Sequence, residues 1–217
     1  MSKTRSPLEA PVLVGVEVTL RPITLDDVGP LVAAAAESRE HYRLSVVPEG
    51  EGAMRAYVER FLRQQAAGDR LPLVTVWRER VVGSTSFIEP RIWAWPPGSV
   101  MQRADRPDVV EIGSTWLAGS AQRTRCNSEA KLLMLAHAFE RWGVHAVFLK
   151  TDARNERSRR AIERLGAALD GIRRADMPAA DGTVRNSAWY SMTASEWPSI
   201  KAQLQRRLAG GGAAYDR

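Results

Sequence analysis

The sequence predicts an α/β fold of the α+β kind, in which a mixed β-sheet carries helices on its faces. Strands and helices are expected in the order β-α-α-β-β-β-α-β-α-β-β-α. Two strand–loop–helix units follow one another in residues 109–131 and 147–165. Two further pairs of strands are joined by short turns, as in hairpins. Together these observations favour a sheet that combines parallel and antiparallel strands.

The first elements are a strand and two helices. Residues 16–23 alternate apolar and polar side chains, which is typical of a strand with one buried face. Residues 24–27, Thr-Leu-Asp-Asp, have the spacing of a capping box with Asp in place of the usual Glu. They predict a helix that reaches about Glu37. Apolar residues at helical spacing predict a second helix within residues 51–67.

A hairpin, an insert and a long strand come next. Residues 73–77 and 81–88 are expected to pair around a charged turn. Residues 90–107 form an irregular insert that contains four prolines. Residues 109–117 are rich in β-branched and aromatic side chains and predict a further strand.

The second half alternates strands and helices before a final hairpin. After a helix over residues 127–143, an apolar strand is expected at 147–151 and a helix at 155–165, closed by Gly166. A right-handed crossover would make the strands at 109–117 and 147–151 parallel, with both helix N-termini at one edge of the sheet. The last elements are strands at 169–177 and 184–192, with a turn at Asp181-Gly182, and a helix capped by residues 193–196.

Length and composition indicate one domain over residues 15–209, with a lead-in at 1–14 and a flexible tail at 210–217. The single cysteine excludes an internal disulfide framework and suits a reducing compartment. We find neither a leader-like apolar segment nor a stretch long enough to span a bilayer, so a cytoplasmic protein is expected. The three histidines lack metal-ligand spacing, so no metal is expected.

The net charge of +6 suits an anionic ligand, nucleic acid or simply a solvated basic surface. Nucleic acid is the weakest of these interpretations, because no base-reading motif accompanies the charge. An anion is more specifically indicated by residues 122–127, Gln-Arg-Thr-Arg-Cys-Asn, which lead into a helix. The N-terminus of a helix offers unpaired N–H groups and a partial positive charge, and both favour phosphate.

Three features together resemble the GNAT acyl-CoA-dependent N-acetyltransferases, and among them the RimJ/RimL-like branch. They are Glu111, the loop that starts at Gln122, and the Asn155-x-x-Ser158 turn; the resemblance spans roughly residues 16–195. It implies a mostly antiparallel sheet with a parallel strand pair at the coenzyme site. It also implies acetyl-CoA as co-substrate and an amine as acceptor.

The resemblance assigns the pyrophosphate of coenzyme A to the loop of Gln122, Arg123, Thr124, Arg125, Cys126 and Asn127. Asn155 would bind the pantetheine arm. One position departs from the family pattern, because Arg125 stands where a glycine is expected. Arg125 could crowd the phosphate if the loop needs a positive φ there, or its guanidinium could bind the phosphate. A non-catalytic acyl-CoA-binding or regulatory module of the same fold is therefore the alternative function.

The same resemblance proposes roles in catalysis. Glu111 would be the general base; otherwise it is a strand-edge carboxylate paired with an arginine such as Arg173 or Arg174. The backbone near Trp116 and Leu117 would stabilise the oxyanion. Ser158 or Tyr190 would protonate the leaving thiolate, although the Ser158 hydroxyl could equally cap or position the helix.

Two features outside this scheme are left open. Cys126 at a helix N-terminus beside an arginine is expected to have a lowered pKa, yet no partner base is visible for a covalent role. Trp93 and Trp95 in the insert could line an acceptor pocket or pack down as a hydrophobic plug. The expected partner is an amine acceptor, either a small molecule or a protein N-terminus, and a homodimer is left open. Membrane binding is not expected.

Overall fold

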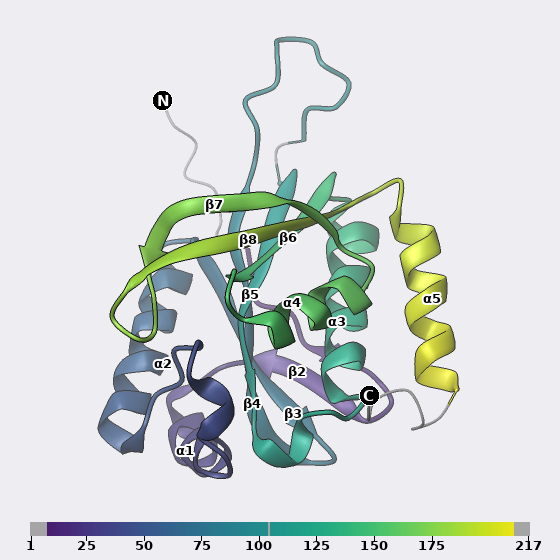
Figure 1. Cartoon of the computed structure of the whole chain (residues 1–217). Coiled ribbons are helices and arrows are strands. Elements are labelled where there is room, and N and C mark those ends of the chain that lie inside the picture. The colour runs from purple at the N-terminus through teal and green to yellow at the C-terminus, as the bar shows by residue number, and fades with distance from the viewer. Residues whose placement is uncertain (1–7, 104, 211–217) are drawn as a thin grey trace.

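The structure, a computed structural model, describes residues 8–103 and 105–210. Its core is an eight-stranded sheet in the order β1-β2-β3-β4-β5-β6-β8-β7 (Figure 1). β5 and β6 are parallel, and every other neighbouring pair is antiparallel. The mixed, mostly antiparallel sheet with one parallel pair is thus confirmed.

The strands lie close to their predicted positions. They are β1 (Leu13–Val14), β2 (Val18–Pro22), β3 (Arg70–Trp77), β4 (Arg80–Arg91), β5 (Val109–Leu117), β6 (Ala146–Asp152), β7 (Ala168–Pro178) and β8 (Val184–Thr193). β1 was not predicted; it falls within the expected lead-in and pairs with β2. The sheet therefore begins before residue 15. Residues 1–7 of the lead-in and 211–217 of the tail lie outside the described residues.

The helices are α1 (Val28–Ala36), α2 (Gly50–Ala66), α3 (Cys126–Ala136), α4 (Glu156–Arg164) and α5 (Trp197–Ala209). A 3₁₀ turn precedes α1, and it carries the predicted capping box, in which the Thr24 N–H donates to Asp27 Oδ2 over 2.8 Å. After Ala136 the predicted long helix changes to a π-helical segment, His137–Trp142, which ends at Gly143 with φ of 66°. Left-handed glycine is a common helix terminator.

Different helices pack on the two faces of the sheet. On one face the Tyr57 hydroxyl of α2 lies 2.9 Å from Ser84 Oγ of β4. On the other face the Phe87 ring of β4 packs 4.6 Å from Trp142, which follows α3. We call these the α2 face and the α3 face. α4 also lies over the α3 face, where its Glu163 accepts a hydrogen bond from Tyr190 of β8 (Figure 1). None of the helices in residues 8–103 and 105–210 has the length and apolarity to cross a membrane.

Candidate active site

The two parallel strands part from each other soon after they begin. β6 pairs with β5 only along residues 109–111, where Glu111 lies opposite Phe148. Residues 112–117 of β5 have no strand partner on that side, and we call this segment the open edge of β5. Unpaired N–H and C=O groups along a strand can bind an extended ligand by main-chain hydrogen bonds.

A β-bulge lies within the open edge. Ser84 pairs with Trp116 and Ser86 with Gly113, so β5 has one residue more than β4 between these pairs. Ser114 takes a φ of 50°, which a residue with a side chain adopts only at some cost. The Ser114 hydroxyl accepts a hydrogen bond of 2.9 Å from Arg70 Nη1. Bulges redirect neighbouring groups and are frequent beside active sites.

Glu111 lies where the two strands separate, and its side chain is on the α2 face. The residue is 8% exposed, and its carboxylate Oε2 is 3.0 Å from Lys150 Nζ. Burial raises the pKa of Glu111, and the nearby Lys150 ammonium opposes that rise. A buried carboxyl with a raised pKa and some solvent access is suited to accepting a proton near neutral pH.

The ion-pair partner of Glu111 differs from the one considered from the sequence. Arg173 instead forms an ion pair with Asp176, with 3.1 Å between Nε and Oδ1. Lys150 takes the place beside Glu111 because alternate residues of β6 share a face, and Phe148, opposite Glu111, is two residues earlier. This lysine could not be assigned without the register of the two strands.

The far end of β5 is held firmly. The Leu117 carbonyl accepts hydrogen bonds from the Tyr42 hydroxyl over 2.8 Å and from Gln122 Nε2 over 2.7 Å. The Trp116 ring is buried on the α2 face, where its Nε1 donates to the Tyr57 hydroxyl. The side chain of Trp116 is thus occupied, and any contribution of these residues to an oxyanion site comes from the backbone.

The loop after β5 does not have the backbone expected of it. Arg125 has a φ of −70° and is the N-cap residue of α3, so no glycine is needed at this position. The residue with positive φ is Arg123, at 59°. Of the two alternatives left open for Arg125, the one that needed a positive φ there is excluded, because the left-handed residue comes two positions earlier.

The Arg125 side chain is turned towards other parts of the protein. Its Nη1 donates to the Leu208 carbonyl near the end of α5 over 2.9 Å, and its Nη2 is 3.9 Å from Glu17 Oε2. The guanidinium ties α5 and the residue before β2 to the start of α3. The expectation that it serves as a phosphate-binding fork is accordingly not supported.

Two other loop side chains fix the loop itself. Gln122 donates to Leu117 as described and accepts a 2.7 Å hydrogen bond from Arg157 Nη2 of α4. The Thr124 hydroxyl donates to the Ala121 carbonyl and accepts from the Cys126 N–H. Gln122 therefore links the two strand–loop–helix units, and Thr124 satisfies one of the free N–H groups of α3. Asn127 follows in the first turn of that helix.

The thiol of Cys126 is not in a reactive environment. Its side chain is fully buried, and burial raises the pKa of its thiol to about 12. The lowered pKa expected at a helix N-terminus is wrong here, because desolvation of a thiolate outweighs the helix dipole. A protonated, inaccessible thiol cannot serve as an acyl-carrying nucleophile.

Two exposed cations belong to this region, Arg123 in the loop and Arg157 in the first turn of α4. Partial burial, and next the charge of Arg123, lower the pKa of Arg157. In the part of the chain that the structure describes, neither guanidinium forms an ion pair with a carboxylate. Like charges held together without a counterion favour a bound anion. Arg157 was not assigned from the sequence, where it was one of several arginines on a basic helix.

The start of α4 has the predicted turn. Asn155 is the N-cap, and its Oδ1 accepts a 3.0 Å hydrogen bond from the Ser158 N–H. Ser158 is half-buried in the first turn. The Asn155 amide oxygen thus caps the helix, and its NH₂ group can still donate to a ligand.

Tyr190 is separated from Glu111 by the sheet. It pairs with Leu149 of β6 and points to the α3 face. Its hydroxyl donates to Glu163 Oε1 over 3.0 Å and accepts from Arg159 Nε over 3.1 Å. Burial raises the pKa of Tyr190, so its proton is retained at neutral pH. The structure therefore brings Tyr190 together with α4 and not with Glu111.

The two tryptophans of the insert pack at the other end of β5, where the strand begins. The Trp93 N–H and the Trp95 Nε1 both donate to the buried Asp108 carboxylate, over 2.7 and 3.2 Å. The Trp93 ring also stacks on His145 with 5.5 Å between centroids, yet 43% of the residue is exposed. The pair thus packs against Asp108 and His145, and the expected role of these tryptophans in an acceptor pocket stays a prediction.

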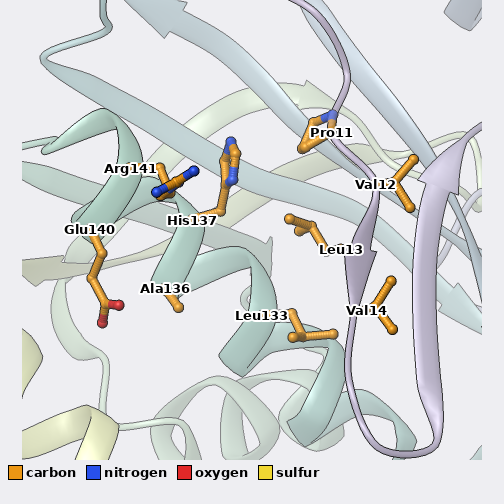
Figure 2. Close-up of a pocket in the computed structure, with 9 residues that line it drawn as sticks. All are labelled: Pro11, Val12, Leu13, Val14, Leu133, Ala136, His137, Glu140 and Arg141. Carbon is orange, nitrogen blue, oxygen red and sulfur yellow. The ribbon is translucent and has the colours of Figure 1, made fainter.

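A groove elsewhere on the molecule is unrelated to this site. It lies between β1 and α3 with its π-helical continuation, and it is lined by residues 11–14 with Leu133, Ala136, His137, Glu140 and Arg141 (Figure 2). β2, β3 and β4 separate β1 from β5 in the sheet.

The described residues contain no group of three or more His, Cys, Asp or Glu arranged to hold a metal.

Comparisons with known proteins found a family model and similar solved structures. Residues 17–168 match the model of the acetyltransferase (GNAT) domain family. A T. thermophilus protein assigned as an acetyltransferase is 32% identical, with a TM-score of 0.74 and coverage of 94% of this chain and 98% of its own. Among proteins of curated function, none matches this chain.

More distant structures show the fold alone. RimJ of Mycobacterium smegmatis, solved with a coenzyme A disulfide, is 20% identical with a TM-score of 0.71, covering 94% of this chain and 93% of its own. RimL, the ribosomal L7/L12 α-N-protein acetyltransferase solved with coenzyme A, is 16% identical with a TM-score of 0.66, covering 84% of this chain and 98% of its own.

Proposed function

This chain belongs to the GNAT acetyltransferase family, and we propose that it moves an acetyl group from acetyl-CoA directly to a primary amine. The observation that supports this proposal most directly is that β5 and β6 separate immediately after Glu111. This places a buried carboxylate at one end of an unpaired stretch of backbone and a cationic loop at the other. The acceptor is a small molecule or a protein N-terminus, and the RimJ and RimL likeness supports the second without deciding it.

The residues present fit coenzyme A. Arg123 and Arg157, with the N-termini of α3 and α4, would hold its phosphates. The open edge of β5 and the Asn155 amide would hold its pantetheine arm. Acetyl-CoA supplies the acetyl group in activated form, as a thioester.

Glu111 would remove the proton from the acceptor amine. An amine with a pKa near ~10 is mostly protonated at neutral pH, so a base is needed. The raised pKa of Glu111 makes the carboxylate a better base than an exposed one, while the Lys150 ammonium keeps a useful fraction ionised.

Charge that develops on the carbonyl oxygen would be stabilised by a backbone N–H of the open edge near Trp116 and Leu117. One such donor contributes roughly 2.7–4 kcal/mol in related acyl-transfer sites. Hydrogen bonds to the Leu117 carbonyl fix this segment beforehand. Of the two candidates for protonating the thiolate, we favour Ser158, because Tyr190 is already bonded to Glu163 and Arg159.

The reason for considering a non-catalytic module no longer holds. It rested on Arg125, which takes an ordinary helical backbone and binds other parts of the protein. Nothing at Glu111 suggests a disabled site.

The experiment is an assay of free thiol release from acetyl-CoA with a panel of primary amines, with mass spectrometry of the products. We expect thiol release that depends on an amine, and an acceptor that gains one acetyl group. Binding of acetyl-CoA with no acetylation of any amine would instead support the non-catalytic alternative.

A further inference from the structure

Arg70, at the start of β3, is a buried cation with neutral partners. The residue is 9% exposed. Its Nε donates to Gln64 Oε1 over 2.7 Å, its Nη1 donates to the Ser114 hydroxyl, and its guanidinium lies 4.1 Å from the Phe61 ring centroid. In the part of the chain described by the structure, Arg70 has no ion-pair partner, and its Nη2 makes no hydrogen bond. A buried charge without a counterion is costly to fold, which suggests that a ligand supplies one.

Arg70 and Glu111 belong to one row across the sheet. Arg70 of β3 pairs with Ile88 of β4, and Ile88 pairs with Glu111 of β5. Side chains in such a row point to the same face, and two strand spacings amount to about 10 Å. Burial lowers the pKa of Arg70, and the negative charge of Glu111 partly opposes this. A small acceptor bound between them on the α2 face would therefore contact both groups.

The other charges on this face leave an excess of positive charge. Three carboxylates are already paired with basic residues: Glu111 with Lys150, Asp152 with Arg154, and Asp176 with Arg173. Half-buried Arg185 donates to the Ser187 hydroxyl and, among the described residues, is in no ion pair. Arg91 is exposed beside Phe148. Against these stands Glu89, an exposed carboxylate that acts on both Arg70 and Glu111.

We propose that the acceptor carries a carboxylate near its amine, and that Arg70 binds this carboxylate while Glu111 receives the proton of the amine. The inference rests on the proposed function. A planar guanidinium with a free edge is well suited to a carboxylate, which accepts two parallel hydrogen bonds. Polycationic amines, such as aminoglycoside-like antibiotics, are disfavoured at this site because they would meet Arg70 and Lys150.

The carboxylate can come from two sources, which matched acceptors distinguish. One pair is glutamate and glutamine amide, which tests the α-carboxylate of a free amino acid together with its side chain. The other pair is two amidated pentapeptides that begin Ser-Glu-Glu and Ser-Gln-Gln, which test acidic side chains next to a peptide N-terminus. The measured quantity is kcat/KM for each acceptor at saturating acetyl-CoA.

The wild-type enzyme should prefer the acidic member of at least one pair by roughly 10- to 100-fold, the range for a hydrogen bond to a charged group. The pair that shows the preference identifies the source. In Arg70→Met the ratio should fall towards 1, and in Arg70→Lys it should be intermediate. Acetyl-CoA affinity, which does not involve Arg70, reports whether each variant is folded.

Equal kcat/KM for both members of both pairs overturns the inference while leaving the proposed function intact, provided that acetylation occurs. An acidic preference that persists in folded Arg70→Met overturns the role of Arg70. If neither variant folds, the wild-type ratios still decide whether the acceptor is acidic. Absence of acetylation with every amine contradicts the proposed function itself, and this inference with it.

Discussion

The two faces of β5 each hold a lysine, and the two lysines are in opposite situations. On the α2 face Lys150 is 23% exposed in its side chain and pairs with Glu111. On the α3 face Lys131 of α3 is 4% exposed, and its Nζ donates to the Thr85 and Thr115 hydroxyls over 2.9 and 2.6 Å. Burial lowers the pKa of Lys131 to about 7.

The comparison separates groups that can act in proton transfer, on one face of β5, from groups that affect stability, on the other. The ammonium of Lys150 opposes the rise in the pKa of Glu111, whereas burial among hydroxyls lowers the pKa of Lys131 itself. The α2 face thus holds a charge that can take part in proton transfer. The α3 face holds Lys131 among hydroxyls behind the bulge at Ser114, where burial lowers its pKa. Substitutions on the two faces should therefore affect different properties, namely catalysis on one and stability on the other.

The largest expected effect is that of Glu111→Gln. Removing a general base should lower kcat/KM by roughly 10²- to 10⁴-fold without unfolding the protein. The raised pKa of Glu111 predicts that wild-type activity falls on acidification at a higher pH than for an ordinary carboxyl, since the base is lost when it is protonated. That acidic limb should disappear in the variant. Rates measured across pH test both points.

The control is Glu51→Gln, which removes an exposed carboxylate of α2 and should change kcat/KM by less than about threefold. If Glu111→Gln keeps the wild-type rate and pH profile, the α2 face is not the catalytic face, and the contrast between the two faces fails.

The next largest effect concerns stability on the α3 face. Lys131→Met removes a charge that is costly to bury and should raise the free energy of unfolding at pH 6 by about 1–4 kcal/mol. The Thr85 and Thr115 hydroxyls lie 2.8 Å apart and can still bond to each other.

The pH dependence has a definite sign. Between about 7, the pKa of Lys131 in the folded protein, and 10.5, the ordinary pKa of lysine, the unfolded chain binds more protons, so wild-type stability rises with pH. The gain from Lys131→Met should therefore be largest at pH 6 and shrink as the pH approaches 10. Thermal or denaturant unfolding at several pH values measures it. A gain that does not vary with pH, or one matched by the surface variant Lys201→Met, would refute the lowered pKa of Lys131.

The smallest effects compare two arginines of the loop after β5. Arg125 has protein partners, so Arg125→Gly should cost about 1 kcal/mol of stability and change acetyl-CoA affinity by less than about twofold. Arg123 and Arg157 are in no ion pair among the described residues, so Arg123→Ala should weaken acetyl-CoA binding by roughly tenfold. Calorimetric affinities decide between them. If Arg125→Gly weakened acetyl-CoA binding more than Arg123→Ala did, Arg125 would instead be the residue that binds the phosphate.

Local patterns were sufficient for most of the fold. The bounds of β5 followed from its β-branched and aromatic residues, and the start of α1 from its capping box. β1 was missed because a two-residue strand has no periodicity of its own. The π-helical continuation of α3 was also missed, since its residues have the composition of an ordinary helix.

The site was less accessible, because its decisive contacts join distant parts of the chain. Arg70 and Glu111 become neighbours only through the register of β3, β4 and β5. Lys150 is recognisable only once β6 is placed beside β5. Cys126 shows the opposite error, in which a local rule about helix N-termini is overridden by burial that the sequence alone does not reveal.

The most direct test of the central claim is a calorimetric titration of wild type, Glu111→Gln and Arg123→Ala with acetyl-CoA. If the open edge of β5 and its loop form the coenzyme site, wild type binds one molecule per chain with a Kd of about 1 µM to 1 mM, the usual range of KM values. Glu111→Gln should bind equally well, since Glu111 faces the acceptor side, whereas Arg123→Ala should bind about tenfold more weakly. Absence of binding by wild type at millimolar acetyl-CoA would contradict the account.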